Sequence, residues 1–276
     1  MPELPEVETS RRLLDPFVVG RTVVSVEVNR GRVLRRQERD ADFAGRLTGR
    51  RVRGTRRLGK HLMIDLDDDL TWVIHLGMSG RLAIAADGAE PPPHTHVQIR
   101  LDDDTEIWFT DPRTFGYTVA YTPEEFDRSP TSRLGSDALT DLPDATRLAS
   151  LLERRTAPIK ALLLDQSLIA GIGNIYADEA LHGAAIDPFR QGGTLESGEL
   201  GRLVTAISVT LDMALASGGT SLDDLAYLLP DGRTGDYLER LQVYGREGEP
   251  CLRCGAPVRR SVIRGRSTFW CSECQS

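Results

Sequence analysis

Long apolar runs and several residue types are scarce in this chain of 276 residues, and each scarcity excludes or disfavours a class of protein. No segment approaches the roughly 18 consecutive apolar residues of a membrane-spanning helix, which excludes a helical membrane protein. The first twenty residues include Glu3, Glu6 and Glu8, so they lack the apolar centre of a secretory signal peptide. Hydrophobic residues still make up 40% of the chain, enough for a buried core. We therefore expect a globular protein of the cytoplasm.

Cysteine is confined to the end of the chain, as Cys251-x-x-Cys254 and Cys271-x-x-Cys274. Two such pairs, each on a tight turn, supply the four thiolates of a tetrahedral zinc site. Disulfide bonds are the alternative, and the lack of a secretory signal disfavours them. The pattern predicts one structural zinc ion without identifying a function, because zinc ribbons serve many proteins.

The segment between the two cysteine pairs, APVRRSVIRGRSTFW, alternates polar and apolar residues and contains a turn signal at Gly265. This pattern predicts a β-hairpin with Arg264 and Arg266 at its tip. A hairpin with arginines at the tip suits a phosphate backbone or a groove of nucleic acid. The alternative is that these arginines are ordinary solvated surface.

Lysine and asparagine are each limited to two positions. Of the 34 basic residues only Lys60 and Lys160 are lysines, and the only asparagines are Asn29 and Asn174. Because arginine serves as the general surface cation here, a retained lysine points to a need for a compact ammonium on a flexible stem. Scarcity alone does not assign a role to these residues.

The net charge of -7 argues weakly against a nucleic-acid partner, but the charge is unevenly distributed. Residues 11–60 contain fifteen basic and five acidic residues, and residues 251–276 contain five and one. Two basic ends on an acidic body indicate a local polyanion-binding surface with strongly salt-dependent affinity. A solvated face that arose by chance is the alternative.

The residue pattern predicts an α+β fold of two domains that ends in a zinc-finger β-hairpin. Residues 3–14 have helical periodicity, residues 21–122 have the alternation of about eight short antiparallel strands in a sandwich or barrel, and residues 123–145 resemble a boundary. Helical periodicity follows in residues 146–155, 158–167, 174–184 and 197–217. We expect a β-sandwich domain at 1–130, a helical domain at 145–235 and a zinc finger at 241–276.

The amino terminus, MPELPEVET, places a proline directly after the initiator methionine. A small second residue normally allows removal of Met1, which would leave Pro2 with a free secondary amine. Amines attack aldehyde-like carbons to form Schiff bases, and Glu3 and Glu6 lie close by as proton donors or acceptors. An ordinary helix start with acids favoured by the helix dipole is the alternative.

Further motifs occur in a fixed order along the whole chain: Gly59-Lys60-His61-Leu62, HLGMSGRL (75–82), DPRTFG (111–116), AGIGNIYADEAL (170–181), SGGTS (217–221) and LQVYGREGEPC (241–251). Together with the opening and the cysteine pairs, they resemble the bacterial formamidopyrimidine-DNA glycosylase / endonuclease VIII family. The opening MPELPE, rather than MPEGPE, is similar to the formamidopyrimidine branch.

This resemblance implies a bifunctional DNA glycosylase and AP lyase of base excision repair that acts on oxidised purines. It implies that Pro2 attacks C1′ of the damaged nucleotide, that Glu3 assists as proton donor, and that Glu6 supports them. Lys60 matches a catalytic residue that contacts phosphate near the lesion. Lys60 and Arg266 are carried over as further proton-donor candidates.

The resemblance also implies how the chain contacts double-stranded DNA with damaged bases or abasic sites. Met78, Arg113 and Phe115 match the residues that fill the gap left by an extruded base. The remaining DNA-binding candidates are Lys60, His96, Lys160, Asn174 and Arg266. The role of Lys160 stays open between a phosphate or base contact and a structural ion pair, and the strand position of His96 favours a structural role. Within a helix–two-turn–helix, the GIG before Asn174 lets backbone amides approach a phosphate.

The chain departs from the family pattern at Thr114, where a second arginine is frequent, and at His61, where tyrosine is usual. The family's loop over the extruded base corresponds to residues 218–237. We expect a bacterial-type, nucleoid-associated monomer with no membrane partner. The alternatives are an endonuclease VIII-like preference for oxidised pyrimidines, a non-catalytic lesion binder, and a zinc-ribbon adaptor protein, which leaves Pro2 and the gap-filling residues unexplained.

Overall fold

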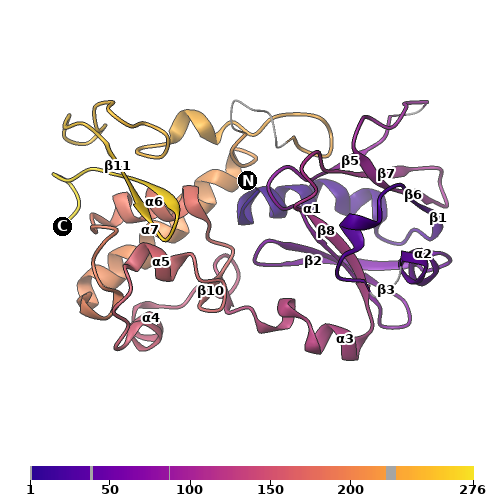
Figure 1. Cartoon of the computed structure of the whole chain (residues 1–276), viewed down its shortest axis with the longest axis horizontal. Coiled ribbons are helices and arrows are strands. Elements are labelled where there is room, and N and C mark those ends of the chain that lie inside the picture. The colour runs from indigo at the N-terminus through magenta and orange to yellow at the C-terminus, as the bar shows by residue number, and fades with distance from the viewer. Residues whose placement is uncertain (1, 38–39, 87, 222–227) are drawn as a thin grey trace. The chain divides into compact units, whose positions relative to one another are not determined.

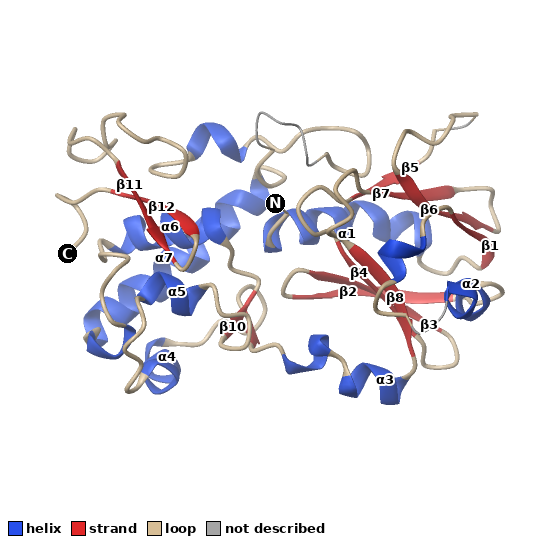
Figure 2. Cartoon of the chain, in the orientation of Figure 1, coloured by secondary structure: helices blue, strands red, loops and turns tan. Residues whose placement is uncertain are grey.

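A computed structural model of the protein describes residues 2–37, 40–86, 88–221 and 228–276. The chain forms two compact units, one of residues 1–133 with 217–236 and one of residues 134–216 with 237–276 (Figure 1). Met1, whose removal the predicted chemistry requires, lies outside the described residues, as do residues 222–227 of the predicted 218–237 loop. The first unit carries most of the strands and the second most of the helices (Figure 2).

The first unit contains two four-stranded sheets in which every pairing is antiparallel. One sheet has the order β1 (Val23–Val28), β6 (Thr95–Leu101), β7 (Glu106–Thr110) and β5 (Arg81–Ile84). The other has the order β2 (Val52–Leu58), β3 (His61–Leu66), β4 (Thr71–His75) and β8 (Tyr117–Tyr121). One apolar core takes residues from both sheets, including Leu62, Ile74, Val97 and Phe109. The predicted antiparallel sandwich is confirmed.

Helix α1 (Leu4–Val18) completes this core with Val7, Leu14 and Val18, all at most 1% exposed. The apolar periodicity predicted a helix that ends near residue 14. The helix continues through Pro16, and burial of Val18 is the gain that holds this last turn.

Two short helices of the first unit were not predicted. Helix α2 (Asp40–Leu47) lies in a region interpreted as strands, and it buries Phe43 and Leu47 completely. Helix α3 (Pro123–Arg128) lies in the predicted boundary segment, where Thr122 caps it by accepting a hydrogen bond from the Glu125 amide. Short 3-10 turns occupy Gly31–Leu34, Pro130–Arg133, Gly192–Thr194 and Tyr237–Arg240.

The second unit packs helices α4 (Ala145–Leu152), α5 (Ile159–Leu163), α6 (Asn174–Ala184) and α7 (Ser197–Ala216). Strands β9 (Ser136–Asp137) and β10 (Ile169–Ala170) add one short parallel pair. Helix α5 is shorter than predicted because the Asp165 side chain accepts a hydrogen bond from the Ser167 amide and starts a turn. Among the described residues, no helix is both long and apolar enough to cross a membrane.

Strands β11 (Arg259–Ile263) and β12 (Arg266–Trp270) form the predicted hairpin. Ile263 pairs with Arg266, so the connection is the two residues Arg264 and Gly265. Their φ angles of 47° and 75° suit the type I′ turn that matches the twist of paired strands. Arg266 lies directly after the turn and is exposed.

Candidate functional site

The start of helix α1 holds the predicted nucleophile and its acids. Pro2 is buried, and Glu3 and Glu6 are each 1% exposed. The Glu3 amide donates to Glu6 Oε2 at 2.7 Å, and the Thr220 amide donates to Glu6 Oε1 at 2.7 Å. Glu6 therefore fixes the first turn of α1 against a segment more than two hundred residues away in the sequence.

Gly219 allows this contact with Glu6. Its φ is +86°, a conformation that side-chain-bearing residues rarely adopt. A Cβ atom at this position would lie 2.7 Å from Glu6 Oε1, well inside van der Waals contact. The SGGTS motif thus has a structural reason in the backbone approach to Glu6.

A chain of polar contacts runs from α1 to the Lys60 turn. Arg57 donates to Glu8 Oε2 at 3.3 Å and to the Gly59 carbonyl at 3.0 Å. Burial raises the pKa of Glu8, but hydrogen bonds from Arg11 and neighbouring arginines outweigh it and hold that pKa below its ordinary value. Leu58 pairs with His61, so Gly59 and Lys60 form a two-residue turn that presents the half-buried lysine.

Beside Lys60, three rings pack at the ends of β3, β4 and β8. His61 Nε2 lies 2.8 Å from the Tyr117 hydroxyl, and His75 stacks on Tyr117 with ring centres 5.3 Å apart. Burial lowers the pKa of His61 to about 4 and the pKa of His75 well below its ordinary value, so both rings are neutral at pH 7. The guanidinium of Arg36 lies 4.5 Å from the Tyr117 ring centre.

Met78, Arg113 and Phe115 lie on two neighbouring loops of the first unit. The guanidinium of Arg113 donates to the Met78 carbonyl at 3.4 Å and lies 5.9 Å from the Phe115 ring centre. Arg113 is exposed, and Phe115 is 50% exposed although it is a large apolar residue. Exposed apolar side chains on such a braced loop are available to a partner.

Buried polar groups brace these loops from below. Asp111 is fully buried, and its two carboxylate oxygens accept from the Ser79 hydroxyl at 2.5 Å and from the Gly116 amide at 2.7 Å. His96 is 4% exposed, and its Nε2 lies 2.8 Å from the Asp111 carbonyl. Arg35 donates to the Phe115 carbonyl at 2.7 Å. The loop that carries Arg113 is therefore held from both sides.

Thr114 adopts an unusual backbone conformation in the same loop. Its φ is 54°, which is strained for a β-branched residue, and its side chain is 7% exposed. Thr114 is the position where a second arginine is frequent in the family. Here the threonine side chain is buried, whereas its neighbours Arg113 and Phe115 are exposed.

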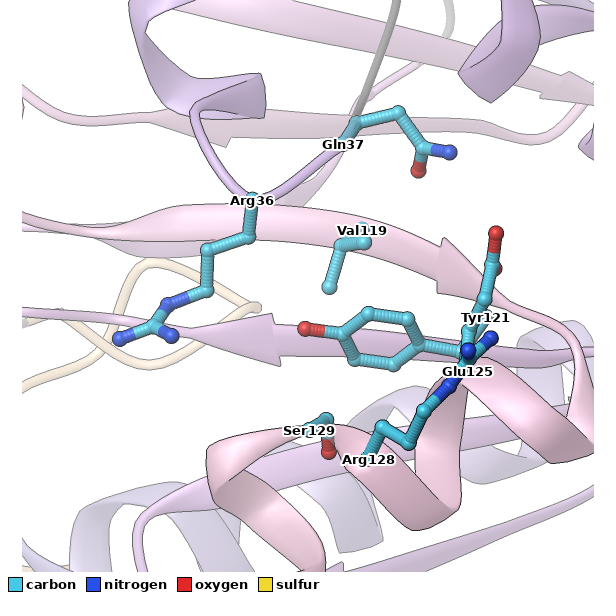
Figure 3. A pocket seen from close by; sticks show the side chains of 7 residues that line it. All are labelled: Arg36, Gln37, Val119, Tyr121, Glu125, Arg128 and Ser129. Carbon is cyan, nitrogen blue, oxygen red and sulfur yellow. The ribbon is translucent and has the colours of Figure 1, made fainter.

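A separate cavity of about 250 Å³ lies in the first unit, beside β8 and α3 (Figure 3). Its lining residues are Arg36, Gln37, Val119, Tyr121, Glu125, Arg128 and Ser129. Glu125 is paired with Arg46 at 2.6 Å, and Gln37 accepts from the Ala120 amide at 2.9 Å. None of the predicted site residues lines this cavity.

In the second unit, Lys160 is fully buried. Its ammonium lies 2.7 Å from Asp178 Oδ1 and donates to the Ser267 carbonyl at 2.7 Å and to Thr268 Oγ1 at 3.0 Å. Burial raises the pKa of Asp178, and the ammonium of Lys160 opposes that rise. The side chain of Lys160 is 0% exposed and these three groups surround its charge.

Asn174 begins helix α6 and contacts the same hairpin. Its Nδ2 donates to the Ser267 carbonyl at 3.0 Å, so Asn174 and Lys160 share one acceptor next to Arg266. Gly173 is the N-cap, and the Gly171 φ of 109° requires glycine in the turn before it.

The four cysteines lie in one cluster, with all sulfur atoms within 4.8 Å of one another. The Cys251 and Cys274 sulfurs are 3.9 Å apart, and those of Cys254 and Cys271 are 3.5 Å apart. A tetrahedron with zinc–sulfur bonds of about 2.3 Å has edges of about 3.8 Å, so the cluster fits one zinc ion.

The sequence reasoning did not single out several buried polar residues that hold these sites together. Glu179 accepts hydrogen bonds from the backbone amides of Gln242, Val243 and Tyr244. Asp178 Oδ2 accepts a hydrogen bond from the Phe269 amide at 2.9 Å. A signal was present, since ADE places two adjacent acids inside an otherwise apolar helix.

Three family models match this chain. They describe the formamidopyrimidine-DNA glycosylase N-terminal domain over residues 1–118, the formamidopyrimidine-DNA glycosylase H2TH domain over residues 134–225, and a zinc finger found in FPG and IleRS over residues 248–276.

Full-length relatives and solved structures agree with these matches. Formamidopyrimidine-DNA glycosylases from Geobacillus kaustophilus and Acidiphilium cryptum are 41% and 44% identical, and each alignment covers 100% of both chains. The MutM (Fpg) protein of Thermus thermophilus matches with a TM-score of 0.89 and 40% identity over 99% of this chain and 98% of its own.

The Lactococcus lactis enzyme bound to DNA with an abasic site has a TM-score of 0.90 and 32% identity, with 100% of both chains covered. The same enzyme bound to DNA with an oxidised pyrimidine has a TM-score of 0.89 and 33% identity, again over 100% of both chains.

Proposed function

Because this chain belongs to the formamidopyrimidine-DNA glycosylase family, we propose that it is a bifunctional DNA glycosylase and AP lyase of base excision repair. Its substrate is double-stranded DNA that contains oxidised purines, such as 8-oxoguanine and formamidopyrimidines, or abasic sites. It is a bacterial-type repair enzyme, and we propose that it acts in the cytoplasm at the nucleoid.

The observation that carries the proposal is the fixed start of helix α1. Glu6 holds the Glu3 amide, so the residue before it, Pro2, has a defined position at the positive end of the helix dipole. That end disfavours a second positive charge and so favours the neutral amine, which is the nucleophilic form. Removal of Met1 completes the amine.

The chemistry follows from a secondary amine and a neighbouring carboxyl group. The nitrogen of Pro2 forms a bond to C1′, the glycosidic bond breaks, and the damaged base leaves with its electron pair and a proton. Glu3 donates a proton to the sugar oxygen as the ring opens, and an iminium results. The iminium acidifies the C2′ proton, so loss of that proton expels the 3′ phosphate and a second elimination expels the 5′ phosphate. No step requires the zinc ion.

Substrate binding is assigned to exposed and half-buried side chains of the two units. Met78 and Phe115 fill the space left by the extruded base, and Arg113 faces the unpaired partner base. Lys60, Asn174 and Arg266 contact phosphates. His96 and Lys160 are both buried, and we propose that they position the Asp111 loop and the hairpin respectively.

Borohydride trapping tests the proposal with three duplexes, which carry 8-oxoguanine opposite cytosine, an oxidised pyrimidine, or an abasic site. We expect a covalent adduct with the 8-oxoguanine duplex and the abasic duplex, located on Pro2 by peptide mass spectrometry. The Glu3→Gln variant is expected to bind the first duplex but to form far less adduct.

The same experiment separates the alternatives. A solved relative is bound to DNA that contains an oxidised pyrimidine, so oxidised pyrimidines are the alternative substrate class to test. An adduct with the oxidised pyrimidine alone moves the assignment to an endonuclease VIII-like enzyme. Specific binding without any adduct, in protein shown to lack Met1, means a non-catalytic lesion binder.

A further inference from the structure

One face of helix α6 carries three polar side chains spaced four residues apart: Asn174, Asp178 and His182. Residues at this spacing are neighbours on one side of an α-helix. The first two contact the hairpin, as described above. The third reaches the cysteine cluster, because His182 Nε2 lies 3.5 Å from Cys251 Sγ. The stripe therefore runs from a predicted phosphate contact to the zinc site.

His182 lies outside the set of zinc ligands. The four cysteine sulfurs group closely enough to complete a tetrahedron on their own, and among the residues that the structure describes this group contains no histidine. Structural zinc sites are four-coordinate and closed, so a fifth donor has no place. The imidazole is thus beside a ligand rather than on the metal.

The chemistry of the pair favours a hydrogen bond. A cysteine bound to zinc is a thiolate, which accepts hydrogen bonds but cannot donate them. His182 is 2% exposed and Cys251 is 3% exposed, so little water competes at this contact. A neutral imidazole with its proton on Nε2 is the donor that matches the thiolate.

We propose that His182 donates a hydrogen bond from Nε2 to the zinc-bound thiolate of Cys251 and thereby stabilises the zinc site and joins it to helix α6. Partners of this kind, which bind a ligand rather than the metal, orient the ligand and tune its basicity. The four-cysteine pattern of the zinc finger does not itself require a histidine in helix α6.

Further contacts at the same end of α6 strengthen the connection. Gln275 donates to the Ile186 carbonyl at 2.9 Å and accepts from the Cys271 amide at 2.8 Å. The cysteine pair that contains Cys271 is therefore also tied to the chain just beyond α6. Loss of zinc is expected to weaken both the His182–Cys251 contact and the Gln275–Ile186 contact.

Cobalt(II) substitution of the full-length protein tests the hydrogen bond directly. His182→Phe keeps a ring of similar size but removes the donor, whereas His182→Gln keeps an N–H donor. We expect the thiolate-to-cobalt charge-transfer bands to move to lower energy in the Phe variant and to stay near the wild-type position in the Gln variant. Competition with a chromophoric chelator is expected to show a roughly 10- to 100-fold lower zinc affinity for the Phe variant.

A packing control separates this effect from general instability. Leu211 in α7 is 1% exposed, so Leu211→Ala destabilises the same unit without removing a donor to sulfur. We expect Leu211→Ala to lower the melting temperature and leave the cobalt spectrum unchanged. If His182→Phe gives the wild-type spectrum and zinc affinity, or if the Gln and Phe variants behave alike, the hydrogen bond is absent.

The expected effect of His182 on DNA binding rests on the proposed function. It depends on helix α6 holding Asn174, which is proposed to contact a phosphate. We expect His182→Phe to weaken binding to an abasic duplex, and His182→Gln to restore it. The spectrum and zinc affinity do not involve DNA, so a failure of the proposed function leaves them as an independent test of the hydrogen bond.

Discussion

Lys160 and Asp178 form an ion pair of 2.7 Å in which both side chains are 0% exposed. A buried pair of this kind is costly to break, because the remaining charge has lost both water and its partner. We expect Lys160→Met to lower the free energy of unfolding by about 3–5 kcal/mol. The double variant Lys160→Met/Asp178→Leu should recover much of that loss, since no charge is left alone.

Urea denaturation measures this prediction, and an exposed pair supplies the control. Arg154 and Glu153 have side chains that are 91% and 71% exposed, so Arg154→Met should change stability by less than about 0.5 kcal/mol. A Lys160→Met protein with unchanged stability and lost DNA affinity would mean that Lys160 contacts the DNA.

Gly219→Ala is expected to damage the start of helix α1. The new methyl group would overlap Glu6 Oε1, so Glu6 would move and release the Thr220 amide. We expect a loss of about 1–3 kcal/mol in stability and slower adduct formation in borohydride trapping. Gly232→Ala is the matched control, since Gly232 has a similar φ of +84° with nothing within 4 Å. Equal effects from both alanines would assign the loss to backbone strain alone.

Phe115→Ala is expected to separate DNA affinity from stability. The side chain is 50% exposed, so its removal should leave the melting temperature nearly unchanged. Loss of stacking in the duplex should weaken binding to lesion DNA by about 1–3 kcal/mol, or roughly 5- to 160-fold. Phe17→Ala removes a ring that is 44% exposed on α1, and fluorescence anisotropy should show wild-type binding for it. Similar binding losses in the two variants would contradict a specific role for Phe115.

The titration of His61 and His75 is expected to lower stability as the pH drops from about 6.5 to about 4. Asp178, whose pKa burial raises to about 7, offsets part of this loss because it takes up its proton more readily in the folded state. Burial lowers the pKa values of His61 and His75 in the folded protein, whereas both histidines take up protons near pH 6.5 once unfolded. The unfolded state then binds more protons, so acid favours it, by up to about 1.4 kcal/mol per pH unit for each histidine. Urea midpoints across this range measure the slope.

Substitution of one histidine at a time assigns the slope. His61→Phe should flatten the pH dependence between pH 6.5 and 4, because one proton uptake is removed. An unchanged slope in His61→Phe would show that this ring takes up its proton over the same pH range in the folded and unfolded states.

The sequence predicted those parts of the fold that depend on local signals. Helix α6 and the β11–β12 hairpin have clear boundaries, because glycines before Asn174 and at position 265 mark the turns. Helix α2 was missed because the described part of it, residues 43–47, buries two large apolar side chains, Phe43 and Leu47, and two positions do not define a helical period.

Contacts between distant segments were beyond this reasoning. The Glu6 interaction with Glu3 is a local capping pattern, but its other oxygen is used by Thr220, which no spacing rule connects to it. In the same way, the scarcity of lysine singled out Lys160 without showing that the side chain is fully buried. Burial depends on packing against α6 and the hairpin, and this is a property of the folded unit.

The composition of the first unit has a consequence for protein synthesis. Residues 217–236 belong to the unit formed by residues 1–133, and Thr220 supplies one of the two backbone amides held by Glu6. When only the first 133 residues have emerged from the ribosome, residues 217–236 have not yet emerged, so this unit is still incomplete. We expect its amino-terminal segment to reach its final form only after most of the chain has emerged, and a fragment truncated after Arg133 to lack an ordered nucleophile.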